Sequence, residues 1–490
     1  MNQNKTPLLD AINEFIDTKP AYFRIPGHRL DKGISKKWTD KAGSEIFAYD
    51  VTETPFTDDL HSPEGAILEA QKLLAQLYKA DKSFFLVNGT TCGNEAMIIS
   101  AALEGQEIMI ARNAHKSAMM GLIISGAKPV YVMPEVLADW GIQGGITPEA
   151  VRRTFVENPN CKALFLVSPS YYGICADLEE ISKVCHEFGA LLLVDEAHGG
   201  HIYFHKELPV GALEAGADIC VQSFHKVTGA LTQSSVLHLK YRGINDDIID
   251  RISSNLHLVQ STSPSYLLMT SLDCARYELS QNGRQMMTQA LEMAEYARNK
   301  VNNIKGFRCM TNEVIGKASV SGLDETRLVI SAKEIGFTGF ELDEHLFKNY
   351  AVNMELSDYE NALAIITYAN TKEDIDRLIG ACQRISDEYS NNIINKHNDK
   401  NKSLYCTYSS MPVQKMTPRQ AYFSESKEIE WSKAIGAISA GQIVPYPPGI
   451  PAVYPGELIT QEIWEYIEKL RKDKKHIHGI ENDKIKVIKV

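Results

Sequence analysis

A series of short, unbroken apolar runs constrains the fold of this chain most strongly. Seven runs alternate with stretches of helical periodicity, at residues 83–87, 107–111, 129–133, 162–167, 190–195, 219–223 and 235–239. Apolar residues fill consecutive positions of each run rather than alternate ones, which is typical of strands covered on both faces. Strands that alternate with helices favour a sheet with helices on both sides. We therefore predict an α/β unit with a mainly parallel, seven-stranded sheet.

The segment ahead of the first strand predicts a helix. Ser62 is its expected N-cap, Pro63 suits the first turn, and the charge of Glu64 is favourable there. One face of this helix is expected to be apolar, formed by Ile67, Ala70, Leu74 and Leu77.

Changes in composition divide the rest of the chain. A long connecting helix is expected over residues 265–300, and strands of a second α/β unit at 327–331 and 362–368. Residues 386–403 are polar with almost no large hydrophobic side chains, as in a linker. The predicted regions are an N-terminal segment (1–70), a large domain (71–285), a small α/β domain (286–395) and a C-terminal α/β domain (404–490).

Composition excludes several classes of protein. The net charge of −11 over 490 residues opposes binding to a phosphate backbone, so we expect no nucleic-acid partner. The nine cysteines form no CxxC pair, which argues against a disulfide framework and a cysteine zinc site, and no other metal site is expected. No apolar run approaches the ~20 residues of a membrane span. The N-terminus lacks the pattern of a signal peptide. We expect a cytoplasmic protein.

Two charged residues mark the ends of neighbouring predicted strands. Asp195 closes the run 190–195, and Lys226 follows the run 219–223. Functional groups of α/β sheets gather beyond the carboxyl ends of the strands. A lysine there can form a Schiff base with the aldehyde of pyridoxal 5′-phosphate, and a carboxylate can keep the ring nitrogen protonated. Ala197 is small enough for a flat ring to approach closely.

The segment VNGTTCGNEA (87–96) predicts a phosphate-binding turn at a helix start. Gly89 permits a tight turn, Thr90 and Thr91 offer hydroxyls, and a helix N-terminus adds free N–H groups. His115, after the second run, could stack on a ring above the sheet edge. Each feature alone has an ordinary structural explanation, such as a solvated lysine or a capping acid. Their occurrence in order along one α/β unit favours a cofactor site.

At these residues the chain resembles the fold-type I, aspartate-aminotransferase-like enzymes that use pyridoxal phosphate, and specifically the Orn/Lys/Arg decarboxylase family. The resemblance covers nearly the whole chain. Its motifs occur in the family's order: FRIPGH (23–28), DVTE with DDLHSPEGAI (50–67), NGTTCGNEA, RNAHKS, VDEAHGGH, QSFHK, STSPSY (261–266) and PYPPGIP with PGE (445–457). The last motif distinguishes this family from the aminotransferases.

The resemblance implies roles for individual residues. Lys226 would be the Schiff-base lysine, Asp195 the partner of the ring nitrogen and His115 the ring-stacking residue. The expected contacts to the phosphate are Thr90, Thr91, Cys92, Ser223 and His225, although a hydroxyl residue is the family's pattern at position 92.

Further roles concern the substrate and the proton. Thr262 would reach a phosphate across a dimer interface, and Glu457 would receive the distal cation of the substrate. His225, Lys226 or a nearby group would protonate the α-carbon. His198 would line the pocket, or it has a purely structural role. If Glu457 is not the receptor, the next candidates are Glu53, Asp58 and Asp59.

The implied reaction is decarboxylation of a basic L-amino acid. The chain begins almost directly at its PGH motif, so it resembles the short biosynthetic branch, which includes arginine decarboxylases. A guanidinium can pair bidentately with a carboxylate, which favours arginine, converted to agmatine for polyamine biosynthesis, over lysine or ornithine. Sites of this fold type commonly lie between two protomers, so a homodimer or a higher homo-oligomer is expected.

Two other functions would use the same motifs. An aminotransferase or an aldolase-like lyase shares the cofactor cradle, but an aminotransferase needs a late arginine to hold the substrate carboxylate. Arg327 and Arg377 are present, yet neither lies in a motif typical of that clamp. A non-catalytic paralogue is the other alternative, and the intact Lys226 and Asp195 argue against it.

Overall fold

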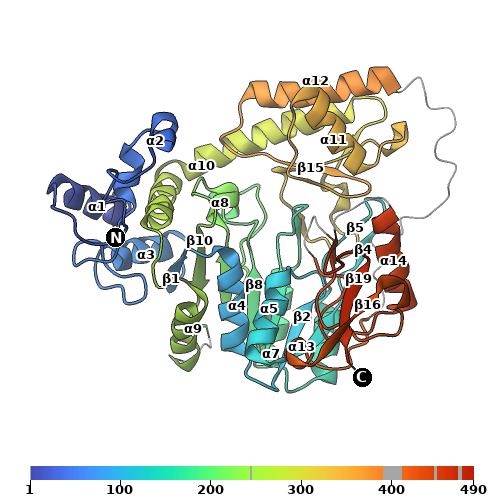
Figure 1. Cartoon of the computed structure of the whole chain (residues 1–490). Coiled ribbons are helices and arrows are strands. Elements are labelled where there is room, and N and C mark those ends of the chain that lie inside the picture. The colour runs from blue at the N-terminus through green and yellow to red at the C-terminus, as the bar shows by residue number, and fades with distance from the viewer. Residues whose placement is uncertain (1, 243–245, 390–410, 446–449, 473–476, 490) are drawn as a thin grey trace.

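A seven-stranded sheet forms the centre of the protein (Figure 1). The computed structural model describes residues 2–242, 246–389, 411–445, 450–472 and 477–489. The strand order is β1-β10-β9-β8-β6-β2-β3, parallel from β9 to β3 and antiparallel where β10 pairs with β9 and β1. The predicted, mainly parallel sheet is therefore confirmed. Its strands are β1 Lys82–Leu86, β2 Glu107–Ala111, β3 Lys128–Val132, β6 Ala163–Val167, β8 Leu191–Asp195, β9 Ile219–Gln222 and β10 Ser235–Leu239.

Helices cover both faces of this sheet, which explains why its strands are apolar at consecutive positions. In β2, Ile108 and Ile110 pack into a core with α4, α5 and α9, whereas Met109 points into the opposite core with α3, α6, α7 and α10. The helices are α3 Ala66–Leu77, α4 Gly89–Ala101, α5 Lys116–Ser125, α6 Pro148–Glu157, α7 Leu178–Glu187, α8 Phe224–Val227, α9 Asp246–Val259 and α10 Tyr266–Asn302.

The N-terminal segment contains α1 Pro7–Asp17 and α2 Lys36–Ala42 and leads into α3. The predicted N-cap Ser62 is wrong, because α3 begins at Ala66. The carboxylate of Asp58 accepts hydrogen bonds from the backbone N–H groups of Gly65 and Ile67, both at 2.9 Å. An acid from the preceding turn thus supplies the acceptor expected from an N-cap.

A smaller unit lies above the sheet in the view of Figure 1 and is reached through α10. Its antiparallel sheet has the order β11-β13-β15-β14. The helix expected over 265–300 is confirmed by α10; the division expected at residue 285 falls inside this helix and stays a proposal. The elements are β11 Arg308–Cys309, β13 Arg327–Ser331, α11 Gly339–Tyr350, β14 Leu356–Ser357, β15 Ala362–Ile365 and α12 Lys372–Tyr389. Two short pairs complete this part: β4 Val136–Leu137 with β5 Ile142–Gln143, and β7 Ile174–Cys175 with β12 Gly322–Leu323.

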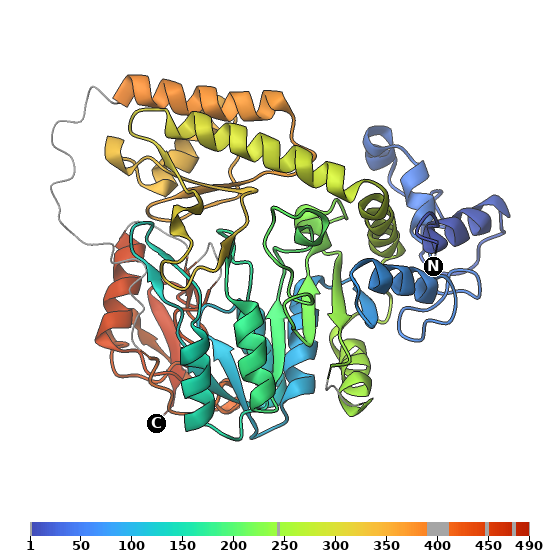
Figure 2. The same cartoon turned by 180° about the vertical axis from the view of Figure 1, so that it is seen from behind.

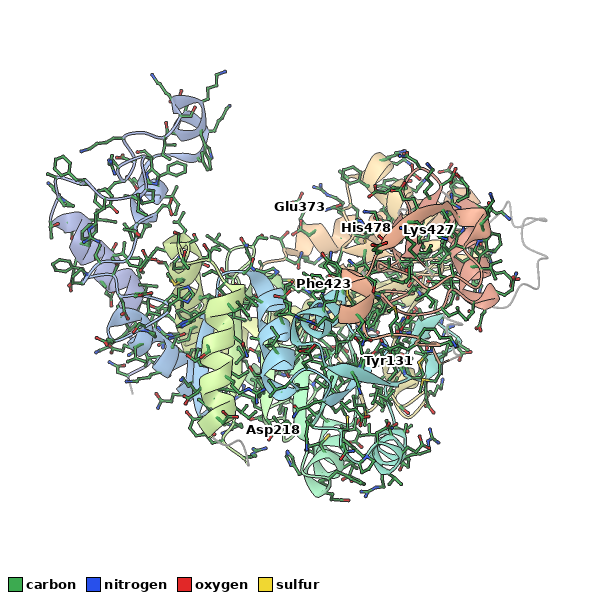
Figure 3. All side chains as sticks on the ribbon, turned by 60° about the horizontal axis from the view of Figure 1, so that its bottom comes forward. Tyr131, Asp218, Glu373, Phe423, Lys427 and His478 are labelled. Carbon is green, nitrogen blue, oxygen red and sulfur yellow. The ribbon has the colours of Figure 1, made fainter. Side chains whose placement is uncertain are left out.

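The C-terminal segments pack beside β3, the edge strand of the large sheet, and Figure 2 shows them from behind. Tyr131 of β3, labelled in Figure 3, contacts Tyr454 with 5.8 Å between ring centroids. Most of the predicted linker 386–403 and part of the PYPPGIP motif lie outside the described residues. The elements are α13 Pro418–Phe423, β16 Ser426–Glu430, β17 Val444–Pro445, α14 Gln461–Lys472, β18 Ile477–His478 and β19 Lys484–Ile488.

Candidate active site

A pocket opens beyond the carboxyl ends of β8 and β9, where the sheet, the small unit and the C-terminal segments meet. Its floor comes from the large sheet and carries half of the predicted site residues: Thr90, His115, Asp195, Ala197, His198 and Lys226. Its other walls come from the small unit, with Phe340, Asp358, Tyr359 and Glu360, and from the C-terminal segments, with Pro445, Ile450, Pro451, Ala452, Tyr466 and Leu470.

Lys226 lies in the short helix α8, which starts directly after β9. Its Nζ is 2.9 Å from Nε2 of His198 and 4.8 Å from the ring centroid of Tyr171. Burial lowers the pKa of Lys226 to about 8, and the negative charges of Asp195 and Glu355 act in the opposite direction. The amine is therefore closer to its neutral, nucleophilic form than a surface lysine is.

Asp195 is buried at the end of β8 and is held by two hydrogen bonds. Nδ2 of Asn94 donates to Oδ2 at 2.7 Å, and the backbone N–H of Ala197 donates to Oδ1 at 3.1 Å. Burial raises the pKa of Asp195, while the charge of Lys226 lowers it. No salt bridge joins this carboxylate to any of the described residues. An oriented, buried acid of this kind suits a cationic ring nitrogen.

The start of α4 forms the expected cradle for a phosphate. Gly89 has a φ of +69°, and its own N–H donates to the backbone oxygen of Gln233 at 2.9 Å. The preceding Asn88 makes no side-chain cap, so the N–H groups that follow Gly89 in the first turn are available to another acceptor. Oγ1 of Thr90 lies 3.0 Å from Oγ of Ser223, which brings two predicted phosphate contacts together. Thr91 is partly exposed in the same turn. This donor set fits a phosphate monoester.

His115 and His198 are both neutral side chains of the pocket. Burial, followed by the charge of Lys226, lowers the pKa of His115 to about 4 and places the pKa of His198 well below its usual range. His115 caps α5, and its Nδ1 accepts a hydrogen bond from the backbone N–H of Ser117 at 3.3 Å, which fixes the ring. Tyr171 packs on His198 with 4.0 Å between ring centroids. A neutral, fixed imidazole suits stacking on an aromatic cofactor.

Five predicted cofactor residues do not line the pocket: Thr91 and Ser223, which lie beside it in the phosphate cradle, and Cys92, His225 and Thr262. Cys92 faces the core, where its Sγ donates to the backbone oxygen of Gly89 at 3.1 Å and burial raises its pKa to about 12. Its predicted phosphate contact is therefore wrong. His225 donates from Nδ1 to the backbone oxygen of Ser234 at 2.9 Å and lies beside the pocket rather than in its wall. Thr262 is exposed, and its contact across a dimer interface stays a prediction.

Glu457 does not lie where a substrate could reach it in this structure. Its carboxylate is 0% exposed, forms a salt bridge with Arg112 at 3.1 Å and accepts a hydrogen bond from the backbone N–H of Tyr454 at 2.7 Å. Its partner Arg112 lines the pocket, whereas Glu457 does not. The geometry contradicts the prediction that Glu457 binds the distal cation directly.

The alternative acids also lie away from the pocket. Asp58 holds the start of α3, and Asp59 accepts a hydrogen bond from the backbone N–H of His61 at 2.8 Å. Glu53 accepts a hydrogen bond from the neighbouring Thr52 hydroxyl. None of the three lines the pocket of its own chain, so within one chain their carboxylates are not placed to receive a substrate cation.

Comparisons with known proteins agree with this geometry. Residues 6–374 match the family model "Orn/Lys/Arg decarboxylase, major domain", and residues 401–486 match "Orn/Lys/Arg decarboxylase, C-terminal domain". The chain belongs to the Orn/Lys/Arg decarboxylase family. It is similar to an arginine decarboxylase of Bacillus subtilis (strain 168), with 37% identity over 490 residues that cover 100% of this chain and 98% of that protein.

Solved structures below 25% identity support the fold of this chain. It is similar to lysine decarboxylase A from Pseudomonas aeruginosa, with a TM-score of 0.86, 21% identity, and coverage of 99% of this chain and 80% of that one. It is also similar to an alanine–glyoxylate aminotransferase from Nostoc sp., with a TM-score of 0.54, 18% identity, and coverage of 69% of this chain and 89% of that one. The predicted fold type is confirmed.

The decarboxylase site contains three residues that sequence reasoning missed. Asn94, which orients Asp195, lies one helical turn after Thr90, so the two share a helix face. Tyr171 and Arg112 follow the carboxyl ends of β6 and β2. The rule that identified Asp195 and Lys226 at strand ends could have found both. Among the described residues, no helix is long and apolar enough to cross a membrane, and no cluster of three ligand side chains could hold a metal ion.

Proposed function

We propose that this enzyme decarboxylates L-arginine to agmatine and carbon dioxide with pyridoxal phosphate as cofactor. The observation that carries the proposal is the end-to-end similarity to arginine decarboxylases, at 36–37% identity, around an intact lysine, aspartate and phosphate cradle. Lysine or ornithine is the alternative substrate. Similarity to the lysine decarboxylase structures is near 21% identity and supports the fold alone.

Separate residues of the site would bind the phosphate, the ring nitrogen and the aldehyde of the cofactor. The phosphate would bind at the start of α4 with Thr90, Thr91 and Ser223, and the ring nitrogen would face Asp195. Lys226 would bind the aldehyde carbon. When bound, pyridoxal phosphate supplies an aldehyde that condenses with amines and a protonated ring that draws electrons from the α-carbon.

Lys226 is the group best placed to return a proton to the α-carbon of the substrate. It lies in the pocket, and its pKa of about 8 lets it hold and release a proton near neutral pH. The neutral Nε2 of His198, 2.9 Å from Nζ, can accept a hydrogen bond from Lys226 and orient it. His225 is the weaker candidate, because its Nδ1 is engaged by a backbone oxygen.

The arginines considered for an aminotransferase clamp are engaged elsewhere. Arg327 is buried, donates to the backbone oxygen of His198 at 3.0 Å and pairs with Asp324 at 3.5 Å. Arg377 lies on the surface of α12 and pairs with Glu373. Neither lines the pocket, so neither is placed to hold a substrate carboxylate for transamination.

We also propose that the enzyme acts as a homodimer, or a larger homo-oligomer, in the cytoplasm and supplies polyamine biosynthesis. Exposed apolar side chains in the N-terminal segment support association: Phe23 is 88% exposed and Phe56 is 63% exposed. The eight cysteines described are all free thiols, which suits a reducing compartment.

A substrate panel tests the proposed reaction. The purified holoenzyme is incubated separately with L-arginine, L-lysine and L-ornithine, and the amine, carbon dioxide and keto acid products are quantified. The proposal expects agmatine and carbon dioxide in equal amounts, with the highest kcat/KM for arginine. A higher kcat/KM for lysine or ornithine would contradict the substrate, and keto acid as the main product would contradict the reaction. A protein that binds the cofactor but turns over none of the three would be a non-catalytic paralogue.

A further inference from the structure

Arg112 is a buried cation that joins the large sheet to the C-terminal segments. It follows β2 and is 1% exposed. One of its terminal nitrogens donates to the backbone oxygen of Pro451 at 2.6 Å. The other donates to the backbone oxygen of Ala452 at 3.1 Å and to Oε2 of Glu457 at 3.1 Å. A single guanidinium thus binds three acceptors that lie more than 330 positions away in the chain.

The C-terminal partners are held in a tight turn. The backbone N–H of Tyr454 donates to the same Oε2 of Glu457, and Gly456 has a φ of +88°. A Cβ at Gly456 would lie 2.2 Å from the backbone oxygen of Met416, so only glycine fits there. The guanidinium carbon of Arg112 lies 4.3 Å from the ring centroid of Tyr454 and 5.5 Å from that of Tyr131 on β3. The ion pair is therefore enclosed by aromatic rings as well as by hydrogen bonds.

This cluster is directly continuous with the pocket. Ile450, Pro451 and Ala452 form an apolar wall of the pocket, and the backbone oxygens of the last two are the acceptors of Arg112. Arg112 itself lies three positions before His115, which lines the same pocket. The wall that belongs to the C-terminal segments is thus attached to the same loop that carries the ring-stacking histidine.

We propose that Arg112, Tyr454 and Glu457 form a latch that fixes the wall 450–452 and thereby sets the fit of the substrate side chain. The inference rests on the proposed decarboxylase function, since the wall faces the substrate of that reaction. Arg112 and Glu457 are positioning residues in this account. The apolar wall contacts the methylene groups of a basic amino acid, and the latch determines how closely it approaches them.

Arg112 and Glu457 form a buried ion pair, so the effect of removing either charge depends on the presence of the other. Removing one charge leaves the other buried without compensation, which is more disruptive than replacing both by apolar groups of similar volume. Arg112→Met and Glu457→Gln should therefore have similar effects, and the double variant Arg112→Met/Glu457→Leu should be less perturbed than either. A direct contact between Glu457 and the substrate would not produce this pattern.

Two measurements on the same variants test the latch. Hydrogen exchange of the peptide 450–457 is followed in the cofactor-free protein. KM for the best basic amino acid is measured in the holoenzyme. We expect exchange in each single variant to be about tenfold faster than in the wild type, with slower exchange in the double variant. We expect KM to rise about tenfold in each single variant, with less change in kcat and an unchanged cofactor spectrum. Arg112→Lys, which keeps the charge but makes fewer hydrogen bonds, should lie between wild type and Arg112→Met.

Glu425→Gln is the matched control, because Glu425 pairs with Lys489 on the exposed surface of the same C-terminal segments. It should leave both exchange and KM unchanged. Unchanged exchange at 450–457 in both Arg112→Lys and Glu457→Gln would overturn the latch, as would a raised KM in Glu457→Gln alone. The hydrogen-exchange measurement needs no substrate. If the wild-type enzyme were inactive on basic amino acids, the proposed function would be rejected, and hydrogen exchange would still test whether the latch fixes the wall 450–452.

Discussion

Desolvation by one pocket acts on Lys226 and Asp195 in opposite directions. Burial lowers the pKa of the lysine to about 8 and raises the pKa of the aspartate, because it disfavours the charged form of each. Both residues are thereby prepared for a cofactor: a less charged amine reacts with an aldehyde, and a buried acid is satisfied by a cationic ring nitrogen. The two properties follow from one location, at the carboxyl ends of adjacent strands.

Replacing Asp195 by Asn should leave the fold and cofactor binding intact but remove most of the activity. The amide can still accept the N–H of Ala197, yet it cannot hold the ring nitrogen protonated. We expect kcat to fall by about 10²- to 10⁴-fold, measured on holoenzyme with confirmed cofactor content. Glu187→Gln, at an exposed acid paired with Arg152, is the control. Near-normal turnover in the Asp195 variant would show that this carboxylate is only structural.

The lowered pKa of Lys226 predicts a pH dependence for uptake of the cofactor. Only the neutral amine attacks the aldehyde, so the rate should rise as the pH increases through about 8 and then level off. An ordinary lysine with a pKa of about 10.4 would still be gaining reactivity above pH 9. Asp195 raises the pKa of Lys226, so Asp195→Asn should move this rise to lower pH. Stopped-flow absorbance of the cofactor reports the rate, and a midpoint near 10 in the wild type would contradict the prediction.

Sequence patterns correctly located site residues that lie at the ends of strands. They misplaced residues whose position depends on contacts with distant parts of the chain. Asp195 and Lys226 follow apolar runs directly, and their place at the sheet edge needs no other information. Glu457 could not be placed in this way, because its partner Arg112 is 345 positions away. Cys92 was assigned a phosphate contact by its position in a motif, but helical geometry turns its side chain into the core.

At the scale of elements, α3 shows how a helix start can depend on an acid outside the usual cap position. Asp58 accepts hydrogen bonds from several N–H groups of the first turn while its own φ is +68°. The pattern Ser62-Pro63 predicts a helix start, yet the observed N-cap is Gly65, three residues later. Local sequence predicted that a helix exists here but not where it begins, because the capping acceptor comes from the preceding turn.

Removing the Asp58 carboxylate should loosen the first turn of α3. Asp58→Ala should reduce the local stability of amides 66–69 by about 1 kcal/mol, measured by hydrogen exchange. Asp58→Asn should lose less, since it keeps an acceptor and tolerates a positive φ. The exposed Glu64, whose side chain does not cap the helix, provides the control Glu64→Ala. Equal protection in all three variants would show that Asp58 does not stabilise the helix start.

The apolar runs predicted the large sheet well because its strands are buried by neighbouring layers of the same domain. The C-terminal segments were harder to place, since no local pattern indicates that they pack beside β3 and close the pocket. This contact depends on Arg112 and on Arg419, which donates to the backbone oxygen of Ile124 at the end of α5 at 2.7 Å. Contacts of such sequence separation leave no periodic signal.

At the scale of the whole molecule, three parts of the chain surround one pocket. The large sheet supplies Lys226 and Asp195, while the small unit and the C-terminal segments supply the other walls. Burial at this pocket lowers the pKa of Lys226 and raises the pKa of Asp195. Activity should therefore require the complete chain, and we propose that this enclosed site removes the α-carboxylate of arginine.

Loss of the α-carboxylate can be followed with L-arginine labelled with ¹³C at its carboxyl carbon. The holoenzyme should release labelled carbon dioxide and agmatine in a ratio of one to one, and Lys226→Ala should release neither above background while Lys240→Ala, altered outside the pocket, behaves as wild type. Retention of the label in a keto acid, or equal release by the Lys226→Ala variant, would contradict the account.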